Sequence, residues 1–153
     1  MQLSINRESL LKAINLIAKA ADKRHNMVIL GNIKLQLSES ELILTASDLE
    51  VELTSKLKLP AGACIEAGTT TLPAIKLKDI CKSLPAQAQI NLTTQENERC
   101  LLTSGKSRFT LGTLPSEDYP SLGNPENITA LTISRSRLID LIHKTQFAMA
   151  IQD

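Results

Sequence analysis

The fold is decided by a stretch that occurs twice, first as Leu3-Ser-Ile-Asn-Arg-Glu-Ser-Leu-Leu-Lys-Ala-Ile14 and again, 128 residues later, as Leu131-Thr-Ile-Ser-Arg-Ser-Arg-Leu-Ile-Asp-Leu-Ile142. Both copies predict a short strand, a polar residue that caps a helix, an arginine in the first helical turn, and an amphipathic helix. The offset exceeds the roughly 20–50 residues of a solenoid repeat. The repeat therefore predicts tandem domains, with a chance match of two strand-to-helix junctions as the alternative.

The second copy follows a stretch with the composition of a linker. Residues 115–126 hold three prolines and one glycine and show no apolar periodicity. We therefore expect a first domain over 1–126, which includes this linker, and the start of a second domain over 127–153. That second part has room for one strand and one helix only, so we expect the 153-residue chain to be a fragment.

Between the two copies the chain alternates helical and strand patterns, which predicts an α+β domain with antiparallel sheets. Apolar spacing of three and four residues predicts helices, with Asn6 capping the first and Pro73 opening the second. Apolar residues at every second position predict strands that bury one face. The helices are expected at 7–25, 73–83 and 134–148, and the strands at 33–37, 42–46, 49–59, 63–71, 89–93, 99–104 and 108–113.

Composition narrows the class of protein. With 42% hydrophobic and 22% charged residues, the chain can bury a core. Only 2% of the residues are aromatic, which argues against single-strand binders that stack bases on aromatic rings. No apolar run approaches the roughly 18–20 residues of a membrane span, and the N-terminus lacks a signal peptide, so we expect a cytoplasmic protein. The cysteines, which we expect to be buried thiols, are Cys64, Cys81 and Cys100.

The net charge of +1 hides an uneven distribution. The stretches 7–25, 73–83 and 134–148 hold 11 basic and four acidic residues, a net +7, so the remainder carries −6. Such asymmetry attracts anionic partners, and lysine and arginine on helices could face a phosphate backbone without reading bases. The alternative is a set of solvated helix faces.

Motifs for catalysis are missing. Gly105-Lys106-Ser107 suggests a phosphate loop, but Cys100 stands where that motif needs a glycine, so a hairpin turn is the better interpretation. We interpret Asp48, Glu50 and Glu52 as the solvent side of a strand whose Leu49, Val51 and Leu53 face the core. The two histidines, His25 and His143, have no catalytic or metal-ligand residues at motif spacing. We therefore expect no catalytic centre, no metal site and no cofactor.

Seven segments, in this order, closely resemble the bacterial sliding clamp, the beta subunit of DNA polymerase III. The resemblance covers the whole chain and corresponds to the family's first domain and the opening strand and helix of its second. The segments are Ile29-Leu-Gly-Asn32, Leu44-Thr-Ala-Ser-Asp-Leu-Glu50, Thr71-Leu-Pro-Ala74, Asp79-Ile-Cys-Lys-Ser-Leu-Pro85, Ser104-Gly-Lys-Ser-Arg-Phe109, Thr113-Leu-Pro115 and Thr145-Gln-Phe-Ala-Met-Ala150.

The resemblance implies a DNA-clamp fold, with antiparallel sheets outside and two basic helices per domain lining the DNA-facing side. It implies a head-to-tail homodimeric ring that encircles double-stranded DNA and tethers the replicative polymerase, as a non-catalytic processivity factor in DNA replication. The DNA polymerase III catalytic subunit and the clamp loader would bind through the second and third domains, and no membrane is involved. The alternatives are a non-enzymatic interaction scaffold with solvated basic helices, and an enzyme that uses the Gly105 turn on a nucleotide.

The resemblance also implies site residues. Arg24 and Gln152 match DNA-contacting positions, whereas Ile151 replaces the usual histidine beside Gln152. Ile75 stands where the enterobacterial clamp has a DNA-facing arginine, so that contact is expected to move to Lys76 or Lys78. The expected DNA-binding set is Arg24, Lys76, Gln152, Lys78, Lys82 and Lys12. The expected dimer interface is Phe109 and Leu111, which would pack on the neighbouring subunit, and Lys76, Lys106 and Arg108, which would pair with its acids.

Overall fold

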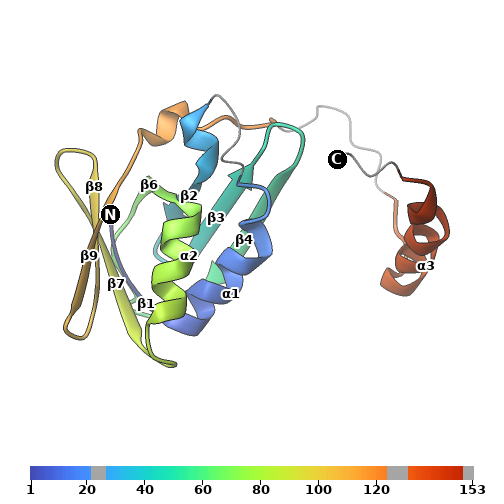
Figure 1. Ribbon diagram of the computed structural model, residues 1–153. Helices are drawn as coiled ribbons and strands as arrows, with labels where there is room; N and C mark the ends of the chain where they lie inside the picture. Colours follow the sequence, from blue (N-terminus) through green and yellow to red (C-terminus); the bar gives the residue numbers. More distant parts are fainter. Residues whose placement is uncertain (22–26, 124–130, 150–153) are drawn as a thin grey trace. The chain divides into compact units, whose positions relative to one another are not determined.

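A computed structural model describes residues 1–21, 27–123 and 131–149 (Figure 1). The chain separates into two compact units, 1–122 and 123–153, and each is described by itself. The sequence predicts this boundary a few residues later, after residue 126. No described helix combines the length and the apolar character needed to cross a membrane.

The first unit repeats one order of elements, a strand, a helix and three strands. The first half contains β1 (Gln2–Asn6), α1 (Arg7–Ile17), β2 (Asn32–Leu37), β3 (Glu41–Ser47) and β4 (Glu52–Lys58). The second half contains β6 (Gly68–Pro73), α2 (Ala74–Ser83), β7 (Gln89–Gln95), β8 (Arg99–Ser104) and β9 (Ser107–Gly112). Short additional elements are β5 (Cys64–Glu66), η1 (Val28–Gly31) and η2 (Ser116–Asp118).

The two halves exchange their first strands. The five-stranded sheet has the order β5-β1-β7-β8-β9, and the four-stranded sheet has the order β4-β3-β2-β6. Thus β1 pairs antiparallel with β7 of the second half, whereas β6 pairs antiparallel with β2 of the first. Neither half can complete a sheet alone, so the two halves fold as one domain. The predicted α+β class with antiparallel sheets is confirmed.

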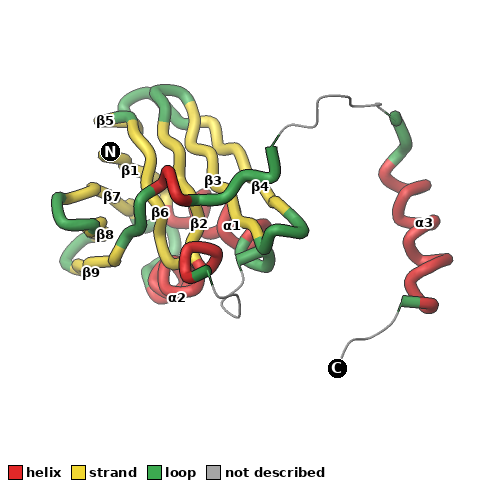
Figure 2. The backbone as a smooth tube through the Cα atoms, turned by 90° about the horizontal axis from the view of Figure 1, so that it is seen from above, coloured by secondary structure: helices red, strands yellow, loops and turns green. Residues whose placement is uncertain are grey.

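Helices α1 and α2 contact each other and lie on the same side of the strands (Figures 1 and 2). Helix α1 buries Leu10, Ala13, Ile14 and Ile17, and α2 buries Ala74, Leu77 and Cys81. Apolar side chains of both sheets complete the single core beneath the two helices. Packing of these apolar faces, rather than helix propensity, stabilises such short helices. Their opposite faces remain in solvent.

The ends of the helices differ from the sequence prediction. Asn6 caps α1 as expected, since its side-chain oxygen accepts a hydrogen bond from the Glu8 N–H at 2.9 Å. The helix ends at Ile17, because the chain tightens there and the Ala20 N–H bonds to the Ile17 carbonyl at 2.9 Å. The predicted end at residue 25 is therefore wrong. Pro73 precedes α2 as its N-cap, because it is still paired with β2.

The predicted strand 49–59 begins later than expected. Leu49 and Val51 lie in the turn between β3 and β4, where 37% and 48% of their surfaces are exposed. The Asp48 carboxylate accepts hydrogen bonds from the N–H groups of Glu50 at 3.0 Å and Val51 at 2.7 Å, and Leu49 adopts a φ of +75°. The expectation that Leu49 and Val51 face the core is wrong, because turn formation by the aspartate overrides the apolar alternation.

The predicted strand 63–71 is divided between the two sheets. Strand β5 pairs with β1 in one sheet, and β6 pairs with β2 in the other. The chain changes sheets at Gly68, where a Cβ atom would lie only 3.1 Å from the Cβ of Met1. Glycine is therefore needed at this close approach.

Leu114 and residues 115–122 of the predicted linker are held on the four-stranded sheet. The Tyr119 hydroxyl accepts a hydrogen bond from the Ser47 N–H at 3.1 Å and donates one to the Asn32 carbonyl at 3.2 Å. The Thr71 hydroxyl donates a hydrogen bond to the Leu114 carbonyl and accepts one from the Leu114 N–H, each at 2.9 Å. Burial raises the pKa of Tyr119. The segment therefore belongs to the first unit, although its composition is that of a linker.

The second unit contains α3 (Arg135–Thr145) and η3 (Gln146–Ala148). Ser134 caps α3 by accepting a hydrogen bond from the Arg137 N–H at 3.4 Å. Residues 131–134 form no strand, contrary to the sequence prediction, because a strand needs a hydrogen-bonded neighbour and no described residue supplies one here. The apolar face of α3 is exposed.

Candidate nucleic-acid interface

The solvent face of the helix pair carries exposed lysines. Lys12 on α1 and Lys76 and Lys82 on α2 are exposed, and Lys78 on α2 is half-buried. None of the four forms an ion pair with a described carboxylate. Unpaired ammonium groups on neighbouring helices are free to attract an anionic surface without a fixed geometry.

The two helices carry less positive charge than the sequence stretches that predicted them. The bounds of α1 and α2 contain five basic and two acidic residues, a net +3, whereas the stretches 7–25 and 73–83 contain eight basic and three acidic residues, a net +5. The acidic residues, Glu8 and Asp79, are exposed beside the lysines. Arg7 bonds to backbone carbonyls of α2, so its guanidinium is partly used inside the domain. A surface of this kind favours weak contacts with phosphates.

Three positions need separate comment. Ile75 lies in the first turn of α2 with 41% of its surface exposed, one helical turn before Asp79. An isoleucine side chain offers a phosphate group no hydrogen bond, so the shift of the contact to Lys76 or Lys78 stays a prediction. Arg24 and Gln152 lie outside the described residues.

Strand β9 forms an outer edge of the five-stranded sheet. Arg108 on this strand and Lys106 in the turn before it are exposed, and Phe109 is half-buried against the core. Leu111 is only 5% exposed and belongs to the core, which leaves little of its side chain for a partner. Lys76 lies on α2 rather than on this edge. The outer backbone groups of β9 could pair with another strand, and the cationic side chains of Lys106 and Arg108 are exposed beside them.

The turn that contains Gly105 joins β8 and β9, as predicted. Ser104 pairs with Ser107 across it, and Gly105 has a φ of +55°, which favours glycine. This geometry closes a two-residue hairpin. The turn is therefore explained by the hairpin.

Two of the three cysteines are buried, as expected. Burial raises the pKa of both Cys81 and Cys100 to about 11, so both remain thiols at neutral pH. Cys64 is only half-buried, and the prediction for it is wrong because it lies on the edge strand β5. Among residues 1–21, 27–123 and 131–149, no group of three histidine, cysteine or acidic side chains could hold a metal ion.

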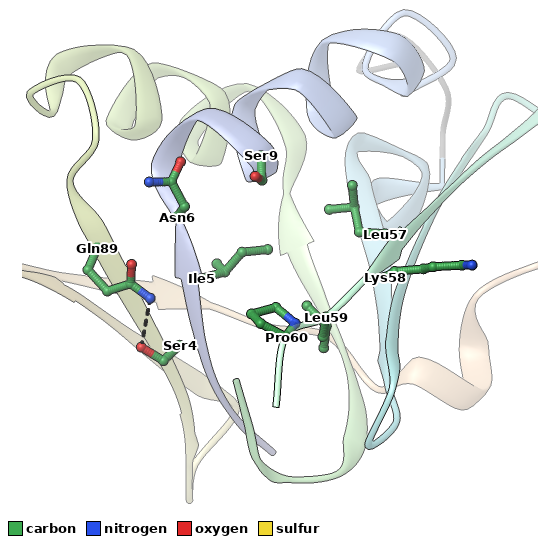
Figure 3. A pocket seen from close by; sticks show the side chains of 9 residues that line it. All are labelled: Ser4, Ile5, Asn6, Ser9, Leu57, Lys58, Leu59, Pro60 and Gln89. Atoms are coloured by element: carbon green, nitrogen blue, oxygen red, sulfur yellow. Dashed lines mark hydrogen bonds between the residues drawn. The ribbon is translucent and has the colours of Figure 1, made fainter. Parts of the chain in front are cut away.

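A pocket of about 210 Å³ lies between the start of α1 and the end of β4 (Figure 3). Its apolar lining comes from Ile5, Leu57, Leu59 and Pro60. The Ser4 hydroxyl at its rim accepts a hydrogen bond from the Gln89 amide at 3.1 Å and donates one to Asn91 at 2.7 Å. Lys58 is the one charged residue in this lining, so the pocket holds no acid–base pair.

Two antiparallel sheets with a pair of lysine-bearing helices on one side define the domain class of the DNA sliding clamps, and solved clamp structures superpose closely. A Pseudomonas aeruginosa sliding clamp bound to griselimycin matches with a TM-score of 0.91 and 42% identity, over 100% of this chain and 41% of that chain. Caulobacter crescentus pol III beta matches with a TM-score of 0.92 and 31% identity, over 100% of this chain and 40% of that chain.

The chain belongs to the DNA polymerase III beta subunit family, whose N-terminal domain matches residues 1–123. It is 42% identical to the beta sliding clamp of Pseudomonas putida over 153 residues, which is 100% of this chain and 41% of that protein. It is 40% identical to the Escherichia coli K12 beta sliding clamp over the same shares. The chain thus spans about two fifths of the length of these relatives.

Sequence reasoning missed the roles of two residues. The charge count does not distinguish Arg7 from the other cations, although Arg7 joins the two helices. The linker prediction includes Tyr119, although this residue is anchored on the four-stranded sheet, away from the lysine-bearing helices. A signal for Arg7 was present in Pro85, which cannot donate the backbone hydrogen bond that Cys81 would receive in a longer helix. No comparable signal marks Tyr119.

Proposed function

We propose that this chain forms the N-terminal part of a sliding clamp that encircles duplex DNA and tethers the replicative polymerase to it. The carrying observation is the set of unpaired, exposed lysines on the neighbouring helices α1 and α2, namely Lys12, Lys76 and Lys82. Both sheets lie on the other side of these helices (Figure 2). A ring built from such domains places its cations inside.

The clamp acts through topology rather than through tight binding. Lysines attract phosphates independently of base sequence, and the attraction is screened by salt. A ring that read bases would stop at its preferred sites, whereas weak phosphate contacts permit sliding. Tethering then raises the effective concentration of the polymerase at the primer end. No catalytic step by the clamp is required, so we propose a non-catalytic, cytoplasmic processivity factor.

The proposed DNA-facing residues lie partly within and partly outside the described part of the chain. Lys12, Lys76 and Lys82 are exposed and can reach phosphates directly. Lys78 is half-buried, and its flexible stem allows the ammonium group to reach solvent. Arg24 and Gln152 complete the set, on the basis of the family resemblance.

We assign ring closure to the β9 edge. A strand of a second copy can pair with this edge, as Phe109 packs against it and Lys106 and Arg108 attract its acidic residues. Lys76 on α2 and the largely buried Leu111 are included in the proposed interface only because the family resemblance assigns them to it. The ring is a head-to-tail homodimer, and residues 127–153 begin its second domain. The polymerase catalytic subunit and the clamp loader bind elsewhere in the full-length protein.

The test uses the full-length protein on nicked circular DNA. After loading by the clamp loader, the protein should elute with the circle in gel filtration and leave it when the DNA is linearised. A variant with Lys12, Lys76 and Lys82 changed to glutamine should be lost faster from the circle. The control changes Lys56 and Lys58, two exposed lysines of β4, to glutamine and so removes two charges rather than three. Equal retention on circular and linear DNA would refute topological binding.

A further inference from the structure

Arg7 connects the two helices of the proposed interface. It is the first residue of α1, yet its guanidinium donates hydrogen bonds from Nε to the Cys81 carbonyl at 2.7 Å and from Nη2 to the Lys82 carbonyl at 3.3 Å. Its backbone N–H also donates to the Ala88 carbonyl at 2.8 Å. A cation at the N-terminus of its own helix opposes that helix's dipole, whereas the same cation complements the C-terminus of α2. The location of Arg7 is therefore explained by α2.

Helix α2 lacks an internal donor where Arg7 binds. The last carbonyls of a helix have no partner within it. The Ile80 carbonyl accepts bonds from the Leu84 N–H at 3.2 Å and the Ser83 hydroxyl at 2.8 Å. The Cys81 carbonyl would next meet residue 85, but Pro85 has no N–H. Arg7 supplies that donor from the neighbouring helix, so the end of α2 depends on α1.

We propose that Arg7 is the positioning residue of the DNA-facing surface, which holds the C-terminal end of α2 against the start of α1 and thereby sets the spacing of the lysines on the two helices. This role rests on the proposed function. Lys82 connects Arg7 to this surface, because Arg7 bonds to the Lys82 backbone carbonyl while the Lys82 side chain is exposed, as is that of Lys12 on α1. Without Arg7, Lys82 keeps its charge and loses its fixed place.

The cysteines provide a local readout in the full-length protein. Cys81 lies in α2 beside Arg7, whereas Cys100 lies in β8, and both are fully buried. Local opening of the helix pair exposes Cys81 alone, whereas global unfolding exposes both. We expect Arg7→Met to accelerate thiol labelling of Cys81 by about ten-fold or more, since hydrogen bonds to a charged donor are lost, and to leave Cys100 unchanged. Arg7→Lys should restore part of the protection.

Labelling is quantified for each cysteine-containing peptide by mass spectrometry. Labelling of Cys81 and Cys100 that rises together in Arg7→Met would overturn the proposal, because Arg7 would then stabilise the domain in general. Unchanged labelling of Cys81 would overturn it as well, since the end of α2 would not depend on the guanidinium.

A double-mutant cycle on the affinity for duplex DNA tests the functional half. We expect Arg7→Met to lower the affinity several-fold in the parent and to have little further effect in Lys82→Gln, because it acts through Lys82. Additive effects would overturn the positioning role and indicate an independent phosphate contact. If Lys82→Gln binds DNA like the parent, the proposed DNA interface at Lys82 fails, and the positioning role with it. Cys81 labelling then still shows whether Arg7 holds the end of α2.

Discussion

Changing Ile75 to lysine tests whether the solvent face of α2 faces the DNA. Ile75 is 41% exposed in the first turn of α2, directly before Lys76. If this face meets phosphates, the new ammonium adds one contact and makes the slope of log K against log salt more negative by about 0.9. From about 50 to about 200 mM salt, the affinity of the variant should therefore fall roughly 3.5-fold more than that of the parent.

The assay is fluorescence anisotropy of a labelled duplex with the full-length protein across a salt series. Ile75→Gln controls for loss of the apolar side chain, and Ile65→Lys adds the same charge on β5, where Ile65 is 58% exposed. A lysine in the first turn of a helix opposes its dipole and costs about 0.3–1 kcal/mol, so thermal unfolding is measured in parallel. An unchanged slope for Ile75→Lys, or an equal change for Ile65→Lys, would refute the assignment of this face to DNA.

Other consequences follow for stability and assembly. Tyr119→Phe should lower the free energy of unfolding of the first unit by about 1–3 kcal/mol in urea titrations, because two buried backbone groups lose their partner. Since burial raises the pKa of Tyr119, its hydroxyl contributes fully to the free energy of unfolding below the ordinary tyrosine pKa of about 10, and this stabilisation is lost as the pH rises through the raised pKa. The free energy of unfolding of the phenylalanine variant should not show this decrease at high pH. Leu49→Gly should raise the urea midpoint, with a gain of about 0.5–1 kcal/mol, because it relieves a bulky residue at positive φ; an unchanged midpoint would indicate no strain there. Leu111→Ala should cost about 2–5 kcal/mol of stability, whereas Phe109→Ala should mainly weaken the dimer in sedimentation; the reverse order would contradict the placement of these two side chains.

Features with local causes were predictable. The Asn6 cap depends on a side chain and an amide two residues away. The buried faces of α1 and α2 follow from helical periodicity alone. The hairpin turn at Gly105 follows from glycine at positive φ. In each case the deciding residues lie within a few positions of one another.

Errors arose where distant segments decided the outcome. The segment 63–71 has an uninterrupted strand pattern, yet its first part pairs with β1 in one sheet and its second part pairs with β2 in the other. Proline and glycine content marked 115–126 as a linker, but the bonds of Tyr119 to Ser47 and Asn32 depend on strands more than 70 residues away. Leu49 and Val51 are the exception, since a local aspartate could have indicated their turn.

The candidate site shows the same division. The sequence revealed lysines on helices and the family resemblance that assigns them to DNA. It could not separate Arg7 from the other cations, because only the packed structure brings its guanidinium to the end of α2.

By itself the sequence determined where the helices begin and which of their faces are buried, and it predicted antiparallel strands. The two similar stretches and the uneven charge are likewise readable from it, because residue spacing and charge are properties of the chain. The tertiary structure alone decided that β1 and β6 exchange sheets, that residues 114–122 join the domain, and which cations remain free. The physical reason is that hydrogen-bond partners in a sheet or at a helix end are chosen by proximity in space. The hydrogen-bond partner of a backbone or side-chain group is therefore decided only when the chain has folded.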